Sequence, residues 1–330
     1  MSRRFVNQLA NGDSLDEVFL VADKQLRANR QGNLYLHLEL RDKSGAIGAR
    51  LWNANEGLAR TFEPGDYLQV RGKVQVFQGA LQVILSHVEP TDPRQLSAED
   101  FLPQTSQNVA KLTIRLRELL RKIGDPHLRA LVDCFLIDDE FLRKFTTAPA
   151  GIKNHHAYQS GLLEHVVTLL TVADRITDLY PEVDRDLLMT GIFLHDIGKI
   201  EELSYERAFA YTDEGQLIGH LVMGVEMLRD KVDRTADLTG EPFPRELLLR
   251  LKHMIVSHHG THEFGSPKLP MTPEAIALHY LDNLDAKIHT FTREIRDDPC
   301  KETSWTPFQQ NLGRRLYKGS GIVAEADSEE

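Results

Sequence analysis

The period of the hydrophobic pattern changes near residue 90 of this 330-residue chain. From about residue 15 to 90, apolar and polar side chains alternate, which is typical of strands buried on one face. From the segment EPTDPRQLSAED onward, apolar residues recur at the three- and four-residue spacing of helices. These two periods are incompatible within one element, so we expect a β-domain followed by an all-α domain.

The alternating half consists of short runs separated by turn sequences. In NLYLHLELRD every second residue is leucine, and in DYLQVRGKVQVFQG an inner set of Leu68, Val70, Val74 and Val76 faces away from Tyr67. The turn sequences DKSG, EPGD and FQGA separate such runs. Five or so short strands in succession fit a small Greek-key barrel, and we predict an OB-fold.

The second half predicts helices over 107–123, 126–136, 138–146, 160–180, 184–196, 217–233, 244–258 and 273–296. The stretch YERAFAYTDEGQ between two of them predicts a short hairpin or loop. The expected organisation is an OB-fold nucleic-acid-binding domain at 1–93, a linker with connecting helices at 94–150, an all-α domain at 151–312 and a C-terminal tail at 313–330. The acidic sequence of the tail predicts disorder.

The composition narrows the class of protein. The chain is 41% hydrophobic and 27% charged, as is typical of globular proteins. No run approaches the roughly 18–20 apolar residues of a membrane span, so we expect no membrane partner. The N-terminal sequence lacks the apolar core of a signal peptide and the two cysteines cannot form a disulfide framework, which favours the cytoplasm. The net charge of −10 argues against a broad basic surface, although a local basic groove would be compatible with it.

Imidazole and carboxylate groups lie on the apolar faces of several predicted helices. His165, His220 and His258 each continue such a face, and so do Asp282 and Asp285. A single inward histidine is more often a hydrogen-bonded core residue. Burying several of these groups without partners would cost on the order of a few kcal/mol each, whereas a divalent metal would satisfy them together.

The stretch TGIFLHDIGKIEEL places His195 and Asp196 directly after an apolar run. The order of His165, this pair and a late aspartate resembles the H…HD…D pattern of the HD metal-dependent phosphohydrolases. The motifs HDIGK, GHLVMGVEML and SHHG resemble the HD enzymes that bind two metals. The resemblance implies an HD domain at 151–312, with Asp196 bridging two metals. The implied ligands are His165, His195, Asp196 and Asp282 for one metal and Asp196, His220 and His258 for the other.

Three further assignments follow from the same resemblance. Asp282 matches the last ligand of the family in the motif LDNLDA, and Asp285, within one helical turn, is the alternative. Lys199, one turn after the His-Asp pair, is expected to approach a phosphate as a point charge, and its alternative is an exposed lysine near a helix end. His259 is expected either to contact phosphate or to contact a metal ligand without binding the metal itself.

The resemblance extends over the whole chain. The motifs NHHAYQSGLLEH, LYPEVDRDLL, FLHDIGKIEEL, YTDEGQLIGH and LDNLDAKI, behind an OB-like barrel, resemble the YhaM-type 3′→5′ exoribonucleases. This resemblance implies hydrolysis of single-stranded RNA, with single-stranded DNA as a further substrate to test, to nucleoside 5′-monophosphates by a two-metal mechanism. It also implies a homo-oligomer. The mixed nitrogen and carboxylate ligands favour Mn²⁺, with iron, cobalt and magnesium as the other candidates.

Outward-facing residues of the barrel are candidates for RNA binding, because OB-folds bind single strands by aromatic stacking in a basic groove. Each of them could instead pack against a loop of the barrel. The candidates are Tyr35, Arg50, Trp52, Arg71, Lys73 and Phe77. In the motif KNHHAY, His155 and His156 could line the substrate entrance or belong to a packed loop.

Two other functions remain open at this point. HD domains with additional histidines also include phosphodiesterases that hydrolyse cyclic dinucleotides or nucleotides, but a single-strand-binding barrel would serve such substrates poorly. A non-catalytic nucleic-acid-binding regulator with a degenerate HD domain is disfavoured, because every expected metal position is filled.

Overall fold

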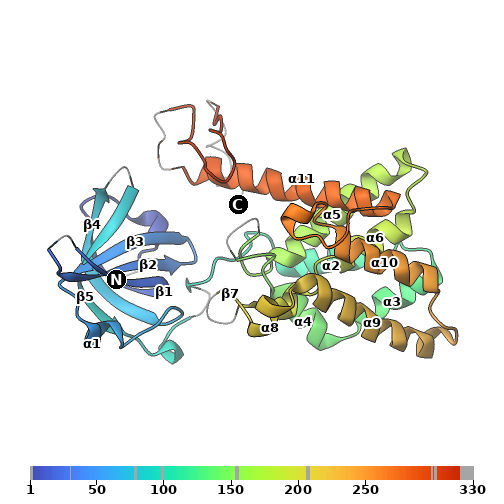
Figure 1. Cartoon of the computed structure of the whole chain (residues 1–330), viewed down its shortest axis with the longest axis horizontal. Coiled ribbons are helices and arrows are strands. Elements are labelled where there is room, and N and C mark those ends of the chain that lie inside the picture. Colours follow the sequence, from blue (N-terminus) through green and yellow to red (C-terminus); the bar gives the residue numbers. More distant parts are fainter. Residues whose placement is uncertain are drawn as a thin grey trace. The chain divides into compact units, whose positions relative to one another are not determined.

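The computed structural model describes residues 3–29, 31–77, 80–97, 100–152, 156–205, 209–298, 300 and 303–319. His155 and residues 320–330 therefore lie outside the described residues. The chain divides into two compact units, one formed by 1–106 with 204–210 and the other by 107–203 with 211–330 (Figure 1). Among the described residues, none of the helices is both long and apolar enough to cross a membrane.

The first unit is a closed five-stranded barrel, as predicted. Its strands, labelled in Figure 1, follow one another around the barrel in the order β1-β2-β3-β5-β4, with β3 and β5 parallel and the other neighbours antiparallel. This order and mixture of directions identify the OB-fold. Its elements are β1 (Ser14–Ala28), β2 (Leu34–Asp42), β3 (Gly45–Trp52), α1 (Glu56–Ala59), β4 (Tyr67–Phe77) and β5 (Ala80–Pro90).

The long strand β1 closes the barrel because it pairs with two neighbours. Its first half, Ser14 to Leu20, pairs with β4, and the stretch from Leu20 to Ala28 pairs with β2. A register shift between Val21 and Asp23 marks the bend, as expected where a strand must turn a barrel corner.

The alternating leucines of β2 form the barrel core, since Leu36, Leu38 and Leu40 are all fully buried. Two side chains of β4 differ from the prediction. Tyr67, expected to face outward, is buried with its ring 4.6 Å from that of Phe101. Val76, expected inside, is 54% exposed because it lies near the end of the β4–β5 hairpin. In β4, alternation therefore predicted the middle of the strand correctly but not its two ends.

The second unit is helical (Figure 1). A pair of two-residue strands, β6 (Leu203–Ser204) and β7 (Ala210–Tyr211), forms a small separate sheet in the stretch predicted as a hairpin or loop. The helices are α2 (Val109–Leu120), α3 (Pro126–Leu136), α4 (Asp139–Thr147), α5 (Gly161–Ile176), α6 (Arg185–Leu194), α7 (Lys199–Glu202), α8 (Asp213–Leu217), α9 (His220–Thr239), α10 (Arg245–Ser257) and α11 (Pro273–Arg296).

Helix α6 lies at the centre of this unit. All residues from Leu187 to Leu194 are buried, which is the pattern of a helix covered on every side. The ring of Phe193 contacts those of Phe135, Phe141 and Phe145, which belong to α3 and α4. The apolar run that precedes the His-Asp pair therefore fixes the end of α6 in the core.

The predicted helices agree with those observed, with small differences at their ends. The range predicted as 160–180 ends as an α-helix at Ile176, and the one predicted as 217–233 starts at His220, after the separate helix α8. Residues 313–319, assigned to the tail from the sequence, include Leu316, which is buried, and Lys318, whose ammonium lies 2.6 Å from Oδ2 of Asp298.

Candidate metal centre

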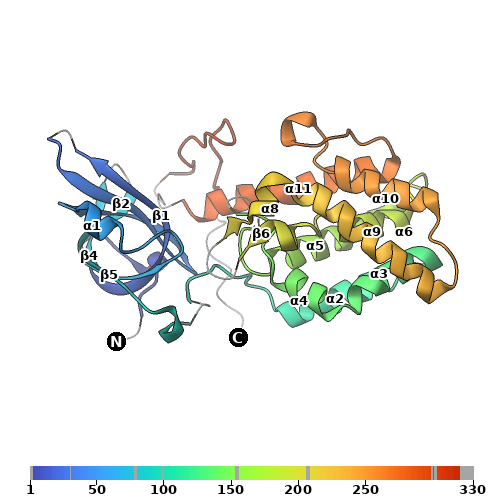
Figure 2. The same ribbon diagram turned by 60° about the horizontal axis from the view of Figure 1, so that its bottom comes forward.

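Histidine and aspartate side chains from separate helices meet at the end of α6. His165 comes from the middle of α5, and His195 and Asp196 follow the last residue of α6. His220 is the first residue of α9 and His258 directly follows α10, two helices that lie side by side (Figure 1, Figure 2). Asp282 comes from α11. All six positions that the sequence predicted as metal ligands are thus brought together.

The two carboxylate oxygens of Asp196 face different histidines. Its Oδ2 lies 3.3 Å from Nε2 of His195 and 3.9 Å from Nε2 of His165. Its Oδ1 lies 3.5 Å from Nε2 of His258 and 3.6 Å from Nε2 of His220. One carboxylate therefore separates two groups of imidazoles.

The other ring nitrogen of each of these histidines binds an acceptor outside the cluster. Nδ1 of His195 donates to the carbonyl oxygen of Ile192, and Nδ1 of His258 donates to that of Ile255. A carbonyl can only accept, so the neutral forms of these two rings carry their proton on Nδ1 and direct the lone pair of Nε2 at Asp196. Metal-binding histidines in proteins show this arrangement.

Carboxylates play the same part for the remaining two histidines. Oδ2 of Asp285 lies 2.7 Å from Nδ1 of His165. Oε1 of Glu202, a buried side chain, lies 2.9 Å from Nδ1 of His220 and 3.0 Å from its backbone nitrogen. The sequence offered Asp285 only as the alternative metal ligand and did not indicate Glu202, because only the fold brings each of them to the outer side of its histidine.

The geometry also separates the two aspartates of LDNLDA. Oδ1 of Asp282 lies 3.3 Å from Nε2 of His165, on the inner side of the ring, whereas Asp285 binds the outer side. Burial lowers the pKa of His165, but its hydrogen bonds to these two carboxylates and the charges of Asp282 and Asp196 outweigh burial and raise the pKa to about 9. The carboxylates near Nε2 of His165 therefore create a negative electrostatic environment that favours a bound cation.

Glycine at 198, within HDIGK, permits two segments of the chain to touch. A Cβ atom at Gly198 would collide with the backbone carbonyl of His220 and the backbone nitrogen of Gly224. The first turn of α9 can therefore lie directly against the α6–α7 turn, which carries Asp196, only because residue 198 has no side chain.

Lys199 forms an ion pair with Asp196, with 2.7 Å between Nζ and Oδ2. Burial alone would raise the pKa of Asp196, but the Lys199 ammonium and the His195 imidazole outweigh it and hold the pKa well below its ordinary value. Asp196 is therefore a carboxylate at neutral pH, and Lys199 brings a positive charge to the edge of the cluster.

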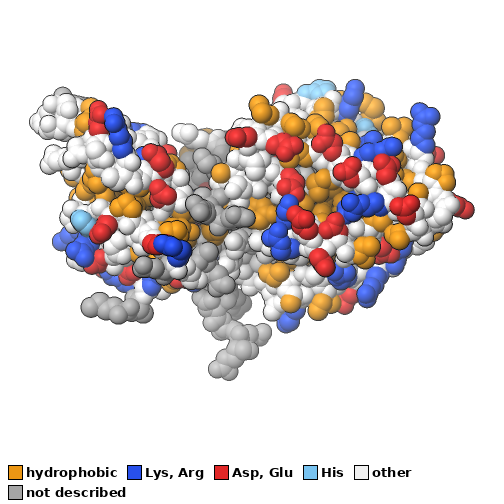
Figure 3. Space-filling model, turned by 90° about the horizontal axis from the view of Figure 1, so that it is seen from below, with side chains coloured by type: hydrophobic (Ala, Val, Ile, Leu, Met, Phe, Trp, Pro, Cys, Tyr) orange, Lys and Arg blue, Asp and Glu red, His pale blue; other side chains and the backbone are white. Residues whose placement is uncertain are grey.

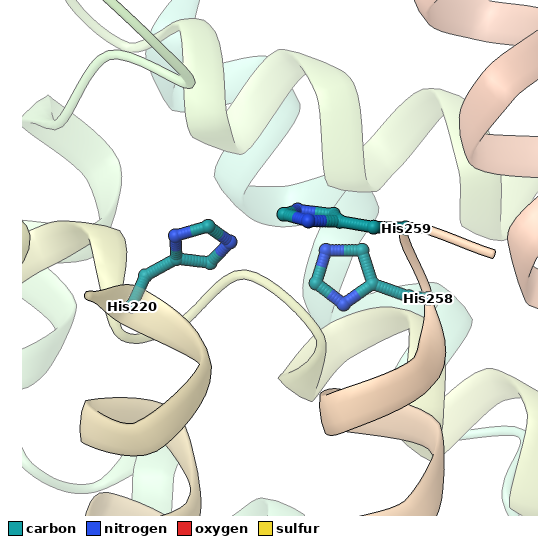
Figure 4. A group of neighbouring side chains, drawn as sticks. All are labelled: His220, His258 and His259. Carbon is teal, nitrogen blue, oxygen red and sulfur yellow. The ribbon is translucent and has the colours of Figure 1, made fainter. Parts of the chain in front are cut away.

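His259 lies beside the second histidine group, as Figure 4 shows for the rings of His220, His258 and His259. Its Nδ1 is 2.9 Å from the carbonyl oxygen of Phe264. Burial, and then the charges of His258 and His220, lower the pKa of His259 to about 3. A neutral ring with an uncommitted Nε2 suits both metal and phosphate contacts.

Within the described part of the chain, two buried side-chain atoms without hydrogen-bond partners indicate that the cluster can hold divalent metals. Among the described residues, Oδ1 of Asp196 and Nε2 of His220 are buried side-chain atoms without a hydrogen-bond partner. Two lone-pair donors facing each other in the interior would repel each other, and a cation between them would remove that cost. The ligand atoms of His165, His195 and Asp282 lie within 4.8 Å of one another, as do those of His195, Asp196 and His258.

His156, before the start of α5, lies on the outer side of His165, because both side chains contact Asp285. His156 is 3% exposed, and its two ring nitrogens lie 2.7 Å from the hydroxyl of Tyr158 and 2.9 Å from Oδ2 of Asp285. The structure therefore links His156 to His165 through a shared carboxylate. His155, predicted with it, lies outside the described residues.

In the barrel, four of the six predicted RNA-binding residues form two pairs. The rings of Tyr35 and Trp52, register neighbours on β2 and β3, have centroids 5.0 Å apart. The guanidinium of Arg50 lies 4.9 Å from the ring centroid of Phe77. Trp52 and Phe77 are more than 40% exposed, so aromatic and cationic groups are available on this surface.

The two remaining candidates differ in their surroundings. Lys73 lies in the same row as Arg50, because Ile84 of β5 pairs with both. Arg71 belongs to another row, and its Nε lies 3.0 Å from Oδ2 of Asp16, so its charge is partly neutralised. On the face of the helical unit shown in Figure 3, acidic and basic side chains are interspersed, which leaves no broad basic surface there.

Two protein-family models match this chain and indicate its class of protein. Residues 162–287 match the HD domain model, and residues 20–91 match the model of an OB-fold nucleic acid binding domain. Together with the histidine and aspartate cluster, these matches define a metal-dependent hydrolase of the HD type with an N-terminal OB-fold.

Relatives of nearly full length define the family. The 3′-5′ exoribonuclease YhaM of Bacillus subtilis is 35% identical over 286 residues, which cover 86% of this chain and 88% of that protein. The YhaM of Oceanobacillus iheyensis is 36% identical over 285 residues, 86% of this chain and 87% of the relative. The chain belongs to the YhaM family of 3′-5′ exoribonucleases. The barrel also aligns with the second OB-fold domain of replication protein A from Methanococcus maripaludis, at 21% identity over 28% of this chain and 96% of that one, with a TM-score of 0.23.

Proposed function

We propose that this chain is a divalent-metal-dependent 3′→5′ exoribonuclease that hydrolyses single-stranded RNA to nucleoside 5′-monophosphates. The observation that carries the proposal is Asp196, whose two oxygens face separate groups of imidazoles. The names of the relatives, 3′-5′ exoribonuclease YhaM, support the substrate and the direction. Hydrolysis would form a bond between a water oxygen and phosphorus, break the bond to the 3′-oxygen of the preceding nucleotide, and leave a proton on that 3′-oxygen.

Two divalent metals would share Asp196, and we propose Mn²⁺, with iron, cobalt and magnesium as the other candidates for this mixture of imidazole and carboxylate ligands. When bound, such metals supply Lewis acidity that favours attack on phosphorus and stabilises the leaving oxygen. The proposed ligands are His165, His195, Asp196 and Asp282 for one metal and Asp196, His220 and His258 for the other.

The residues around the ligands have supporting tasks in this proposal. Asp285 and Glu202 hold the rings of His165 and His220 in the orientation that aims Nε2 inward. Lys199, already next to Asp196, would offset negative charge on the phosphate. His259 would either contact the phosphate or bind the metal beside His220 and His258.

The barrel would hold the single strand upstream of the scissile bond. Exposed rings can stack on any base and cations follow the phosphates, which gives binding with little sequence preference. The proposed contacts are Tyr35, Arg50, Trp52, Lys73 and Phe77, with Arg71 as an additional cation.

The decisive experiment is incubation of end-labelled RNA and single-stranded DNA with the protein and Mn²⁺, with product lengths and termini as the readout. A ladder shortened from the 3′ end with nucleoside 5′-monophosphate release supports the proposal, and Asp196→Ala should abolish it. Faster turnover of a cyclic dinucleotide than of short RNA would refute it in favour of a cyclic-dinucleotide phosphodiesterase. Activity of Asp196→Ala equal to wild type would refute the proposed metal centre.

Two further expectations accompany the proposal. We predict a homo-oligomer, which light scattering after size-exclusion chromatography would test. A cytoplasmic location would suit an enzyme whose named relatives are bacterial exoribonucleases, and cell fractionation would test it.

A further inference from the structure

A pocket with a volume of about 380 Å³ opens beside the candidate metal centre. Two proposed metal ligands, His258 and Asp282, form one end of it. This volume is in the range of sites that bind a single small molecule. The lining of the pocket also includes Phe264, Asn283, Ala286, Lys287, Thr290 and Asn311.

One wall of the pocket is a single face of α11. Asn283, Lys287 and Thr290 follow one another at helical spacings of four and three. With a rise of 1.5 Å per residue, this wall extends about 12 Å from Asp282 to Thr290. Ala286 between them has a short side chain, which leaves the middle of the wall open. The wall therefore leads from the metal ligands outward along the helix.

Two polar groups of this wall have no partner within the part of the chain that the structure describes. These are the ammonium of Lys287 and the side-chain amide of Asn283. Side chains on a helix lean toward its N-terminus, so Lys287 extends toward Asn283 and Asp282. The pocket thus combines a cation near the metal ligands with an amide that can both donate and accept hydrogen bonds.

The lining of the pocket also includes an exposed aromatic ring. Phe264 is 66% exposed although it lines the pocket. The loop that carries it is anchored next to the metal centre, because its backbone carbonyl accepts a hydrogen bond from Nδ1 of His259. A further hydrogen bond links Nδ1 of His279 to the carbonyl of His258, and the ring of His279 occupies the space that a side chain at residue 260 would need. Gly260 is therefore required for the loop to turn here.

We propose that this pocket binds the 3′-terminal nucleotide of the RNA, with the base stacked on Phe264, the ribose hydroxyls hydrogen-bonded by Asn283, and the scissile phosphate beside Lys287. This inference rests on the proposed exoribonuclease function and deepens it. The pocket has a volume that suits a single nucleotide next to the proposed metal ligands, and its lining also includes Thr290 and Asn311. Stacking on a ring is independent of base identity, as degradation of any sequence requires.

The test measures inhibition by AMP, which carries a base, and by inorganic phosphate, which does not. Removal of the ring on which a base stacks lowers the affinity about five- to hundredfold. Phe264→Ala should raise the inhibition constant of AMP and the KM for RNA by that factor while leaving inhibition by phosphate and the metal content unchanged. Phe264→Trp should restore both values. Lys287→Ala should weaken inhibition by both AMP and phosphate.

Matched controls and the alternative outcomes keep the test decisive. Leu249→Ala changes a side chain on α10 that is as exposed as Phe264, and Lys268→Ala removes an exposed cation outside the pocket. Both controls should behave as wild type. If the wild-type enzyme is active and AMP inhibits Phe264→Ala and Lys287→Ala as strongly as wild type, the pocket assignment is wrong but the proposed function stands. An inactive wild-type protein overturns the proposed function itself.

Discussion

Nδ1 of His165 lies 2.7 Å from Oδ2 of Asp285, while Nε2 of the same ring lies 3.3 Å from Oδ1 of Asp282. One imidazole thus distinguishes two carboxylates that are less than one helical turn apart. Asp282 lies on the side that faces Asp196, and Asp285 lies on the opposite side, where it also contacts His156. The two aspartates should therefore respond differently to substitution.

Asp285→Asn is expected to weaken Mn²⁺ binding by about 10- to 100-fold, because an outer acceptor orients the ring and increases its basicity. Saturating Mn²⁺ should restore most of the hydrolysis. Asp282→Asn should stay inactive at every metal concentration, since it removes a proposed ligand. Activity measured against Mn²⁺ concentration distinguishes the two, and the reverse pattern would make Asp285 the ligand.

Glu202→Ala tests the second group of histidines. Glu202 accepts hydrogen bonds from both the ring and the backbone of His220. We expect the metal content to fall from two ions per chain toward one, because His165 and His195 do not depend on this carboxylate. Elemental analysis after dialysis measures the ratio. Glu202→Gln, which keeps an acceptor oxygen, serves as the control, and an unchanged ratio in Glu202→Ala would contradict this role.

Replacement of Trp52 and Phe77 together by alanine should weaken binding of single-stranded RNA by at least about tenfold, since each stacked base contributes about 1–3 kcal/mol. Fluorescence anisotropy with labelled RNA measures the affinity. Tyr180→Ala is a suitable control, because Tyr180 is an aromatic residue of the helical unit that is 54% exposed. Equal affinities for wild type and the double variant would exclude the barrel surface as the binding platform.

Asp138 and Lys231 make a pH-dependent contribution to stability away from the metal centre. Asp138 accepts hydrogen bonds from the Lys231 ammonium and from the backbone nitrogen of Phe141 at the start of α4. The hydrogen bond from Lys231 is the main cause that lowers the pKa of Asp138. A pKa lowered by folding means that the pair stabilises the folded state above the ordinary aspartate pKa of about 3.9. This contribution is lost as the pH falls through the lowered value.

Urea unfolding of Asp138→Asn against wild type measures this contribution. The asparagine can still cap α4, so the difference in the free energy of unfolding reports mainly on the charge. We expect a constant difference of about 1–3 kcal/mol between pH 5 and 8, and a smaller one below pH 4. A difference that grows on acidification would contradict the assignment.

The resemblance to the HD family supplied the pair His195 and Asp196 and the assignment of the six residues as metal ligands. The spacing of apolar residues along the helices placed His165, His220, His258 and both Asp282 and Asp285 on inward faces. The same method placed Leu36, Leu38 and Leu40 in the barrel core. Such predictions succeed where a local period determines which side of an element is buried.

Residues whose role depends on a neighbour from another segment could not be found in the same way. Tyr67 is buried because Phe101, which follows the last strand, covers it. Glu202 and Phe264 carry no periodic signal, and their importance depends on the approach of α9 and on the turn at Gly260. The sequence left open whether His156 lines a substrate entrance or belongs to a packed loop, and only the fold shows that its ring nitrogens lie next to Tyr158 and Asp285.

The contact at Gly198 has a consequence for reading related sequences. A chain may carry every histidine and aspartate of this cluster and still fail to assemble it, if the residue two places after the His-Asp pair has a side chain. Even one methyl group there would push the first turn of α9 outward and carry His220 away from Asp196. Assembly of this cluster therefore requires a glycine at residue 198. In a related sequence, that glycine indicates the ability to bind metal as much as the histidines and aspartates do.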